Sequence, residues 1–580
     1  MEIALSATLR GPIYLGKSVK VREGAVIQGP TVIRDYTIVD ERAQIDRSII
    51  WRNCYIGKGA EVQGAVILRH CSLKAKSVVY EGVVVGDGSI VGEGAIIHPS
   101  VKIWPGKEIE PGATIKNSVI WGAQGRRVLF GPNGVTGMVN VDFTPEFSAR
   151  LGAAFGSTLP KGSVVTFNRD PHRSPRMLKR GAIAGLPSAG VQVADLGVQP
   201  LPVARYFTRV SDAIGGMHVH LSPFDEMVVS MRFMDSGGLD IGKEAARQIE
   251  RVFFREDFRR VYTDEIGTIS YASKVQETYT EGFLRAINVE AIREAKFNLV
   301  VDYAGAPAAT ILPPLLNALG CDVVALNATI DETKMSIPYE DFQDDLRQLE
   351  TISKALGASL GVRIAASGET IFVVDDAGQS LRGIDLCAAM TELTLTAHPG
   401  KTVALAVDLP RMFEEIAARH SSSVIRTRLD ARTLMPSMLT ETIVMAGDGR
   451  GNFIFPDFQP CIDGLMALAR LLEFLATQGR RLSEVVADLP PYYLARTPVY
   501  CVWEMKGRVM RMLNQRFENR LASSADGVKI ALNEREWVLV LPSQDQPYIE
   551  VVAEAESQAT AEALVGEYVQ LVKALQAGEE

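Results

Sequence analysis

An aliphatic residue recurs at every sixth position near the start of the chain. The series runs through Leu15, Val21, Ile27, Ile33, Val39, Ile45 and Trp51. After a slip in register it resumes at Val79, Val85, Val91, Ile97, Ile103, Ile109, Ile115 and Trp121. Glycine often follows the aliphatic residue, as in IGKGAE, VGDGSI and VGEGAI. This period predicts a parallel β-helix with three faces per coil, whose aliphatic residues stack inward and whose glycines allow the corners to turn. An antiparallel meander would instead alternate at every second residue. We assign residues 1–122 to a left-handed β-helix.

Two readings of this repeat region remain open. Some hexapeptide β-helices are acyltransferases that use a histidine at a coil edge, and His70 and His98 are the candidates. A lone histidine in a repeat is more commonly a corner or stacking residue. We therefore favour a rigid module for oligomerisation or docking.

The composition excludes several classes of function. Lys and Arg total 61 against 69 for Asp and Glu, giving a net charge of −8, whereas nucleic-acid binding requires a basic excess. The six cysteines form no CxxC pair, which is typical of reduced thiols. No apolar run approaches the roughly 20 residues of a membrane span, and the first residues lack signal-peptide features. We expect a cytoplasmic protein that contacts neither nucleic acid nor membrane.

The rest of the chain alternates apolar strands with amphipathic helices. Examples are SVVTFNRD followed by SPRMLKRGAIAGLPSAG, FNLVVDYAG followed by AATILPPLLNALG, and TVALAVDLP followed by RMFEEIAARHS. This order predicts βαβ units with mainly parallel sheets. The last stretch, with WVLVLPS, YIEVVAEAES and a closing helix, predicts a smaller α+β unit. We place the boundaries at 126–275, 276–385 and 386–494 for three α/β domains, and at 495–580 for the fourth.

Several of these segments resemble one known family. FTPEFSARLGAAFG, NRDPHRSPRMLKR, DLGVQPLPVARY, FNLVVDYAG and FIFPDFQPCIDGLMALARLLEFLA are similar to sequences of the α-D-phosphohexomutase family, the phosphomannomutases and phosphoglucomutases. With the preceding β-helix, the order resembles the mannose-1-phosphate guanylyltransferase/phosphomannomutase fusion proteins, whose GGxGxRL loop does not occur here. We therefore expect any guanylyltransferase activity to come from a separate chain or a longer gene product.

The resemblance implies a phosphoryl-carrying serine in a TASHNP loop, and this loop differs here. The corresponding residues are Gly215-Gly216-Met217-His218-Val219-His220-Leu221-Ser222-Pro223. If the prolines coincide, His220 takes the carrier position and Ser222 is a displaced hydroxyl; histidine can carry phosphate on nitrogen. On an extended segment His218 and His220 would share one side, as metal sites often require. Alternatively, the loop has drifted and its imidazoles bind a phosphate or nothing.

The metal loop departs further from the family pattern. The resemblance implies DGDxDR, and the equivalent carboxylate positions here are Ala365, Ser367 and Glu369. One carboxylate cannot fix Mg²⁺ against a phosphoryl group. Asp375 and Asp376 follow the next strand and are interpreted as turn residues. We expect no cofactor, with Mg²⁺ required only if the mutase alternative holds.

The remaining family motifs are also altered. The sugar loop GEESGH corresponds to 447–452, where Asp448, Arg450 and Asn452 either bind a ligand or form a glycine-rich hairpin. The phosphate clamp RxSGTEPxxR corresponds to 541–550, which keeps Ser543 but neither arginine. In the entry motif FGTxGIRG, Thr136 replaces the arginine.

A basic helix start survives after the first predicted strand. Arg169, Asp170 and Arg173 are candidate ligand-binding residues, because a helix N-terminus and its side chains hold anions. We favour a structural role for Arg169 and Asp170, as residues that pin the first domain beneath its cleft. We interpret Arg176, Lys179 and Arg180 as a solvated face of the helix.

Three functional hypotheses follow. The first is a binding or regulatory protein, a pseudoenzyme of sugar-phosphate or GDP-mannose-type nucleotide-sugar metabolism. It would bind a hexose phosphate or nucleotide sugar, form a homo-oligomer through the β-helix and associate with a sugar nucleotidyltransferase. The alternative is an active phosphomannomutase or phosphoglucomutase that uses His220. The third is a hexapeptide-repeat acyltransferase.

Overall fold

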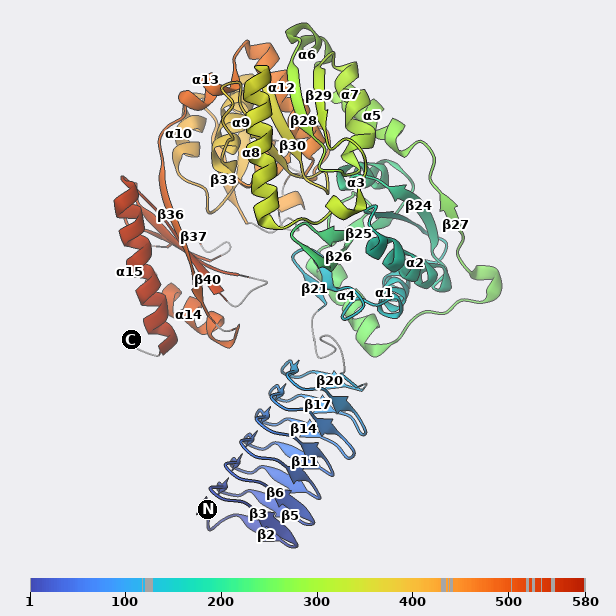
Figure 1. Ribbon diagram of the computed structural model, residues 1–580, viewed down its shortest axis with the longest axis vertical. Coiled ribbons are helices and arrows are strands. Elements are labelled where there is room, and N and C mark those ends of the chain that lie inside the picture. Colours follow the sequence, from blue (N-terminus) through green and yellow to red (C-terminus); the bar gives the residue numbers. More distant parts are fainter. Residues whose placement is uncertain are drawn as a thin grey trace. The chain divides into compact units, whose positions relative to one another are not determined.

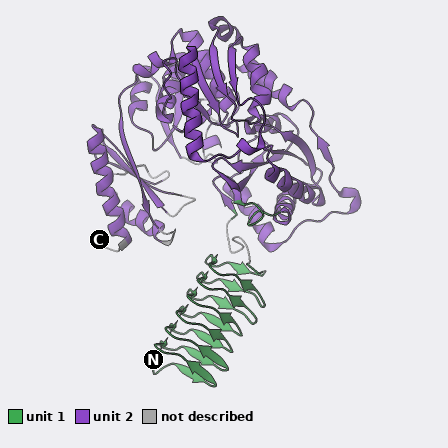
Figure 2. Cartoon of the chain, in the orientation of Figure 1, with its two compact units in different colours: residues 1–129, 137–144 green, residues 130–136, 145–580 purple. Residues whose placement is uncertain are grey.

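The structure is a computed structural model of the whole chain. It describes all residues except 1, 117, 120–128, 429–433, 437, 439–441, 502, 518–520, 524–526, 534, 544–547 and 578–580. The chain divides into two compact units, residues 1–129 with 137–144 and residues 130–136 with 145–580 (Figure 2). The boundary predicted between residues 122 and 126, together with Trp121, lies outside the described residues.

The first unit contains a parallel β-helix, as the six-residue period predicts. Short strands from β1 (Glu2–Ile3) to β20 (Thr114–Ile115) form three parallel sheets, and each strand pairs with the third strand along the chain (Figure 1). For example, β10 (Tyr55–Ile56) lies between β7 (Ile38–Val39) and β13 (Ser72–Leu73). Three strands therefore make one coil.

The slip in the sequence period has a simple structural cause. Tyr55 pairs with Ile38, 17 residues earlier, whereas Ile90 pairs with Ser72, 18 residues earlier. The shorter coils lack one residue on one side, yet Ile50 and Ile67 remain fully buried in the inward column. The column therefore continues through the slip.

The glycines that follow the aliphatic residues serve two different purposes. A Cβ at Gly92 would lie 2.5 Å from the backbone nitrogen of Pro111 in the next coil, so no side chain fits there. Gly94 has a φ of +66°, a conformation that other residues rarely adopt. One glycine permits close stacking of coils, and the other permits the turn.

The second unit begins with a seven-stranded sheet. Its strand order is β21-β22-β26-β25-β23-β24-β27, with β21 (Phe130–Gly131) and β22 (Gly134–Met138) at one edge and β27 (Ile269–Tyr271) at the other. The strands that matter for the site are β23 (Val164–Arg169), β24 (Gln192–Val198), β25 (Gly215–Ser222) and β26 (Asp225–Asp235). The helices are α1 (Pro145–Thr158), α2 (Arg173–Ser188), α3 (Leu201–Val210) and α4 (Lys243–Arg255), and both α2 and α3 contact β23 and β25.

Two four-stranded sheets repeat one plan, in which two strands flank a central strand in parallel and the last strand is antiparallel. The first consists of β28 (Asn298–Asp302), β29 (Asp322–Leu326), β30 (Leu360–Ile364) and β31 (Ile371–Val374). The second consists of β32 (Thr402–Ala406), β33 (Ser423–Thr427), β34 (Ile443–Gly447) and β35 (Phe453–Ile454). Their helices include α7 (Ala308–Ala318), α8 (Tyr339–Leu356), α9 (Gly383–Ala397), α10 (Met412–Arg419) and α12 (Gly464–Gln478).

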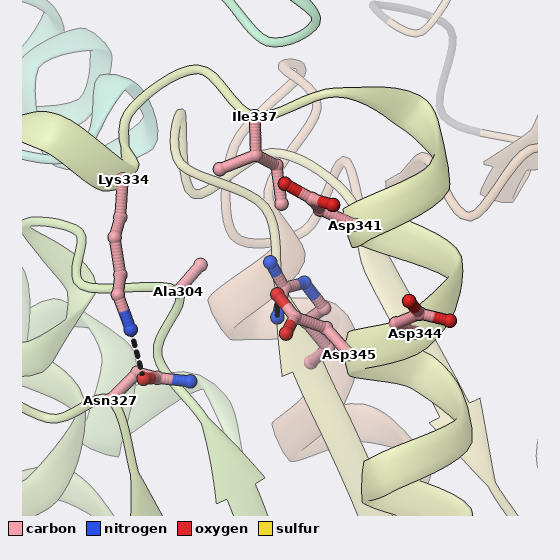
Figure 3. A pocket seen from close by; sticks show the side chains of 8 residues that line it. Ala304, Asn327, Lys334, Ile337, Asp341, Asp344 and Asp345 are labelled. Atoms are coloured by element: carbon pink, nitrogen blue, oxygen red, sulfur yellow. Dashed lines mark hydrogen bonds and ion pairs between the residues drawn. The ribbon is translucent and has the colours of Figure 1, made fainter.

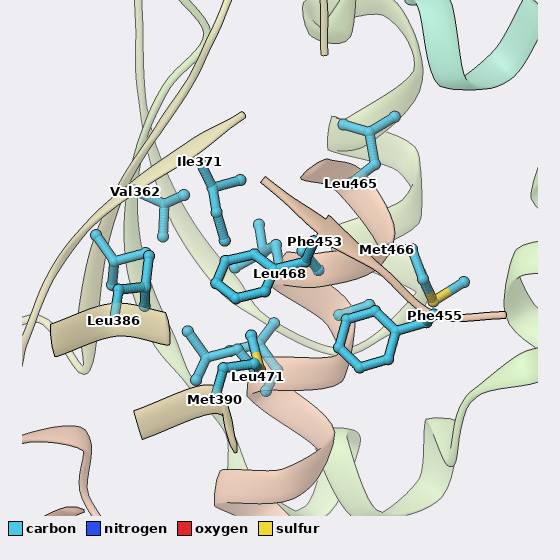
Figure 4. Packing of buried hydrophobic residues seen from close by; sticks show 14 of the residues in the cluster. Val362, Ile371, Leu386, Met390, Phe453, Phe455, Leu465, Met466, Leu468 and Leu471 are labelled. Atoms are coloured by element: carbon cyan, nitrogen blue, oxygen red, sulfur yellow. The ribbon is translucent and has the colours of Figure 1, made fainter. Parts of the chain in front are cut away.

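One apolar core joins these two sheets. Val362 and Ile371 come from the strands on either side of the predicted metal loop, and they share a buried cluster with Met390 of α9 and Leu468 of α12 (Figure 4). This packing holds both ends of the loop. The loop position is therefore set by the core beneath it.

The last part of the chain is a smaller α+β unit, as predicted. An antiparallel sheet contains β36 (Tyr493–Tyr500), β40 (Tyr548–Ala555), β39 (Trp537–Pro542), β38 (Val528–Ala531) and β37 (Leu521–Ser523), and α15 (Gln558–Ala577) contacts β36 and β40 (Figure 1). Lys529 Nζ donates to the backbone oxygen of Val407, 2.9 Å away. The predicted sequence of three α/β domains and one α+β domain is confirmed, while the residue boundaries remain predictions.

Candidate functional site

The two histidines of the altered carrier segment lie on one face of a β-hairpin. In the pairing of β25 with β26, His218 is opposite Arg232 and His220 is opposite Ser230. Directly paired residues project to the same face of a sheet. The sequence left open whether this segment is a loop, as the resemblance implies, or extended. It is a strand up to Ser222, because the ladder continues almost to the turn.

His218 is a fully buried, neutral imidazole. The amide oxygen of Asn168 accepts the Gln199 N–H at 3.0 Å, so the Asn168 amide nitrogen faces His218 Nδ1, also at 3.0 Å. His218 Nδ1 is therefore the acceptor, and its proton resides on Nε2. Burial lowers the pKa of His218 well below its ordinary value, and the neighbouring His220 lowers it further.

His220 is neutral as well, but it reaches the surface. Its ring stacks on that of His218, with 5.3 Å between the centroids and an angle of 16° between the planes. Burial and the Arg232 guanidinium lower the pKa of His220 to about 3. Its buried Nδ1 has no hydrogen-bond partner within the described part of the chain. A neutral imidazole carries a lone pair on one of its two ring nitrogens, which makes it chemically competent as a nucleophile, although the buried Nδ1 is not the atom that a substrate would meet.

A buried group of four charged side chains lies beside the histidines. Arg205 Nη2 of α3 is 2.8 Å from Asp240 Oδ1 and 3.6 Å from Glu369 Oε1. Arg232 Nη1 is 3.4 Å from the same Glu369 oxygen and 3.9 Å from Asp240 Oδ2. Burial alone would lower the pKa of Arg205, but the two carboxylates raise it. We call Arg205, Arg232, Asp240 and Glu369 the arginine cluster.

The predicted metal loop, residues 365–370, connects to the blocks on both sides of it. Its Ser367 carbonyl accepts the Leu201 N–H at 2.9 Å, and its Gly368 carbonyl accepts the Gly464 N–H at 3.0 Å. Thr370 Oγ1 donates to Asn452 Oδ1 at 2.6 Å. The loop thus joins the start of α3, the start of α12 and the predicted sugar loop.

The residues of this loop do not fit Mg²⁺. Its single carboxylate, Glu369, already contacts two guanidinium groups, whereas Mg²⁺ requires near-octahedral oxygen ligands. Across the residues that the structure describes, no three His, Cys, Asp or Glu side chains are arranged to hold a metal ion. Asp375 behaves as the expected turn residue, accepting the Ala377 and Gln379 N–H groups.

The predicted sugar loop is held by its own side chains. Asp448 Oδ1 accepts the Arg450 N–H at 2.8 Å, and Asp448 Oδ2 accepts from the Asn452 amide at 2.6 Å. Arg450 Nη2 is 2.8 Å from Asp408 Oδ2, and Arg496 Nη1 is 3.0 Å from the same oxygen. The sequence left open whether Arg450 binds a phosphate or belongs to a glycine-rich hairpin, and in this structure its guanidinium is paired with Asp408 beneath the loop.

Arg169 and Asp170 make the contacts of structural pins. Asp170 Oδ2 accepts the Leu221 N–H at 2.9 Å, which ties the end of β23 to β25. Burial raises the pKa of Asp170 to about 7. Arg169 Nη1 donates to the Asp170 carbonyl at 2.7 Å. Arg173 is exposed, and its nearest carboxylate is that of Glu332 at 3.8 Å.

The expected solvated face of α2 is wrong at one position. Lys179 is buried, with only 4% of its side chain exposed, and it forms an ion pair with Asp195 on β24. The helix turns this lysine toward the sheet, where Asp195 compensates the charge. Arg176 and Arg180 are exposed, as expected.

The predicted clamp is described only in part. Residues 544–547 lie outside the described residues. The Ser543 N–H donates to the Tyr548 carbonyl at 3.1 Å, and the Ser543 carbonyl accepts from Lys506 Nζ at 2.7 Å. Thr136 of the entry motif hydrogen-bonds Ser230 on the hairpin face, with 2.8 Å between the hydroxyl oxygens.

The β-helix histidines lie at separate places. His70 is a corner residue with a φ of +57°. The His98 ring lies 6.3 Å from that of Tyr80, between centroids.

A hollow of about 310 Å³ lies elsewhere, at the carboxyl ends of β28 and β30 (Figure 3). Asp341, Asp344 and Asp345 from the start of α8 line one side of it, and Lys334 hydrogen-bonds Asn327 on the other. None of the predicted site residues lines this hollow. Its three carboxylates outnumber the two lining cations, Lys334 and Arg363, and Arg363 is already paired with Asp345 at 3.0 Å, so the hollow is a poor site for a phosphate.

Sequence reasoning missed Arg205, Arg232 and Asp240. Arg205 occupies a buried position of α3, within LPVARYFTRV, and a charged residue on an apolar helix face is the signal that could have revealed it. Ser230 and Arg232 alternate in the same way as the HxH pair on the facing strand. Such matched alternation could have placed all four on one face.

Comparison with known proteins identifies the class. Three stretches match the alpha/beta/alpha domains I, II and III of phosphoglucomutase/phosphomannomutase, at residues 127–260, 277–378 and 384–493. A phosphoglucomutase/phosphomannomutase of Thermococcus kodakarensis is 30% identical over 76% of this chain and 97% of its own length. A probable phosphoglucosamine mutase of Methanopyrus kandleri is 29% identical over 77% and 97%.

Solved structures share the fold. A phosphoglucomutase/phosphomannomutase family protein of Burkholderia thailandensis superimposes with a TM-score of 0.68 at 20% identity, covering 78% of this chain and 99% of its own. An Aspergillus fumigatus N-acetylphosphoglucosamine mutase, solved with GlcNAc-6P and magnesium, gives 0.50 at 11% identity over 79% and 97%. The chain belongs to the phosphoglucomutase/phosphomannomutase family.

Proposed function

We propose that this chain is a phosphohexomutase that interconverts hexose 1-phosphates and 6-phosphates, with His220 as the phosphoryl carrier. The observation that carries the proposal is the placement of a neutral imidazole on the hairpin face, beside Arg232 and opposite Ser230. The mutase relatives, which this chain matches over almost their whole length, favour this reading over our hypothesis of an inactive scaffold.

The chemistry requires two transfers. In the first, the free hydroxyl of a hexose phosphate attacks the phosphorus of phosphorylated His220; the N–P bond breaks, an O–P bond forms, and the hydroxyl proton is released to solvent. In the second, the neutral imidazole attacks the other phosphoryl group of the resulting bisphosphate, and the departing sugar oxygen takes up a proton. A hexose 1,6-bisphosphate primes the carrier. The low pKa of His220 keeps the imidazole unprotonated for this attack.

Binding without turnover is the second candidate. The metal loop retains one carboxylate, and Arg232 makes only long ion-pair contacts, at 3.4 and 3.9 Å. Such a site can recognise a phosphate without transferring it. Association through the β-helix into a homo-oligomer, a nucleotide-sugar ligand and a sugar nucleotidyltransferase partner remain predictions. No helix in the described ranges combines the length and apolarity that a membrane span needs.

Phosphorus NMR separates these candidates. Glucose 1-phosphate, mannose 1-phosphate and glucosamine 1-phosphate are each incubated with the protein, Mg²⁺ and the corresponding bisphosphate. We expect a 6-phosphate resonance with at least one sugar, lost in His220→Ala and kept in His98→Ala, a control in the β-helix. Broadening of the substrate line without conversion would favour binding alone, and sharp, unchanged lines with all three sugars would overturn both.

A further inference from the structure

The loop 365–370 presents a charge pattern opposite to that of a metal site. The family resemblance implies carboxylates at Ala365, Ser367 and Glu369, and only Glu369 is present. Its side chain is 8% exposed, and two guanidinium groups lie within 3.6 Å of its Oε1 atom. A divalent cation on that oxygen would sit close to both positive charges and would lack the remaining ligands. Glu369 therefore acts as an ion-pair partner of the two arginines and not as a metal ligand.

The two arginines of the cluster have different surroundings. Arg205 is fully buried, and its Nη1 and Nη2 atoms each donate at 2.8 Å, to the Gly238 carbonyl and to Asp240. It is thus an internal anchor. Its position in α3, one turn after Leu201, which donates to Ser367, fixes Glu369 relative to the first sheet.

Arg232 is the more exposed arginine of the cluster and the one with the longer contacts. Its side chain is 15% exposed, and its contacts with Glu369, Asp240 and the Asn133 amide oxygen are long, at 3.4, 3.9 and 3.5 Å. Its Nε, like that of Arg205, has no hydrogen-bond partner among the described residues. It projects from β26 on the same face as His220. A planar guanidinium with unused N–H groups binds phosphate oxygens in pairs.

We propose that the Arg232 guanidinium takes the place of the divalent cation in this chain, so that a hexose phosphate binds beside His220 without metal. Arg205 and Glu369 act as positioning residues that hold Arg232 on the hairpin face. This inference rests on the proposed function for the identity of the ligand, while the claim that the loop takes no metal stands by itself.

The metal claim is tested by electron paramagnetic resonance with Mn²⁺ as the probe. We expect the signal of free Mn²⁺ to persist on adding wild-type protein. A matched variant, Ala365→Asp with Ser367→Asp and Arg232→Met, restores the carboxylates and removes the cation, and it should reduce the free signal. Stoichiometric Mn²⁺ binding by the wild type that is lost in Glu369→Gln would overturn the proposal.

The phosphate claim is tested by calorimetric titration of glucose 1-phosphate into the full chain. We expect the same affinity in excess EDTA and in Mg²⁺. Arg232→Met should weaken binding by about 10- to 100-fold, the loss expected for hydrogen bonds to a charged group, while Arg247→Met on the exposed face of α4 should leave it unchanged. Circular dichroism confirms that each variant is folded, and Arg232→Lys should recover part of the affinity.

The outcomes distinguish this inference from the proposed function. Binding that is lost in EDTA, or that survives Arg232→Met, would overturn the role of Arg232 even if turnover is observed. If glucose 1-phosphate, mannose 1-phosphate and glucosamine 1-phosphate, each titrated in the same way, all fail to bind, the proposed function and the phosphate claim are overturned together. The Mn²⁺ measurement would still decide whether the loop binds metal.

Discussion

The β-helix and the hairpin region of the second unit differ in what they bury. Inward positions of the β-helix are filled by aliphatic side chains such as Ile56 and Val85, both fully buried. Beside the hairpin, Arg205, Asp240 and Glu369 are buried instead. Apolar burial stabilises at about 25 cal/mol per Å², whereas desolvating an ion pair can cost more than its attraction returns. The β-helix uses the first solution, whereas the hairpin region buries ions at a cost in stability, which is consistent with the function that we propose for it.

Removing one partner of the buried ion pair should give the largest effect. Asp240→Ala leaves the Arg205 guanidinium buried beside a single carboxylate, and we expect the free energy of unfolding of the second unit to fall by about 3–5 kcal/mol. Urea denaturation monitored by circular dichroism measures this. Arg205→Met with Asp240→Leu should regain most of the loss. A fall below about 1 kcal/mol for Asp240→Ala would mean that the cluster is well solvated.

In the β-helix, two adjacent residues of one strand allow the effect of apolar burial on stability to be tested. In β9 (Ile49–Ile50), Ile50 is fully buried and Ile49 is 44% exposed. Ile50→Ala should destabilise the β-helix by about 2–5 kcal/mol through the cavity that it leaves. Hydrogen exchange of the β-helix amides reports the change, and Ile49→Ala is the control, with a much smaller expected loss. Equal effects would contradict the inward assignment.

The pH dependence of stability sharpens the comparison at Asp170. Its folded pKa is about 7, against 3.8 for the ordinary carboxyl. Between these values the folded protein binds the extra proton, so this residue's contribution to stability falls as the pH rises and is lowest above pH 7. Asp170→Asn removes this pH-dependent contribution and can keep the hydrogen bond from Leu221. As the pH rises from acidic to alkaline, the free energy of unfolding of the variant should increase by roughly 1–3 kcal/mol relative to that of the wild type. Denaturant midpoints on both sides of this range measure it, and a constant difference would refute the raised pKa.

An exposed ion pair of the β-helix should give the smallest effect. Lys58 Nζ is 2.6 Å from Glu41 Oε2, but both side chains are largely exposed, at 59% and 43%. Water and salt screen such pairs, so Lys58→Met should change stability by less than about 1 kcal/mol. Thermal unfolding at low and high salt checks this. A larger loss would show that surface charges contribute materially to the stack of coils.

The fold could be predicted because its signals are local or periodic. The inward column of the β-helix follows from spacing alone. The cause of the slip is visible only in the structure, where some coils have 17 residues and others have 18. The shared side of His218 and His220 follows from strand alternation. Glu369 and Arg232 are 137 residues apart in the chain, and no local pattern pairs them. Lys179 was misplaced because the charge of Asp195 on a neighbouring strand could not be foreseen.

The sheets of the β-helix also set a length. The sheet from β1 to β19 (Glu108–Ile109) contains seven strands, and neighbouring strands in any sheet are about 4.8 Å apart, so its first and last strands are separated by about 30 Å. The single-residue deletions shorten the side of a coil and leave this axial rise unchanged. Anything that binds the first coil is therefore held at a fixed distance from the last one, and the number of coils sets that distance.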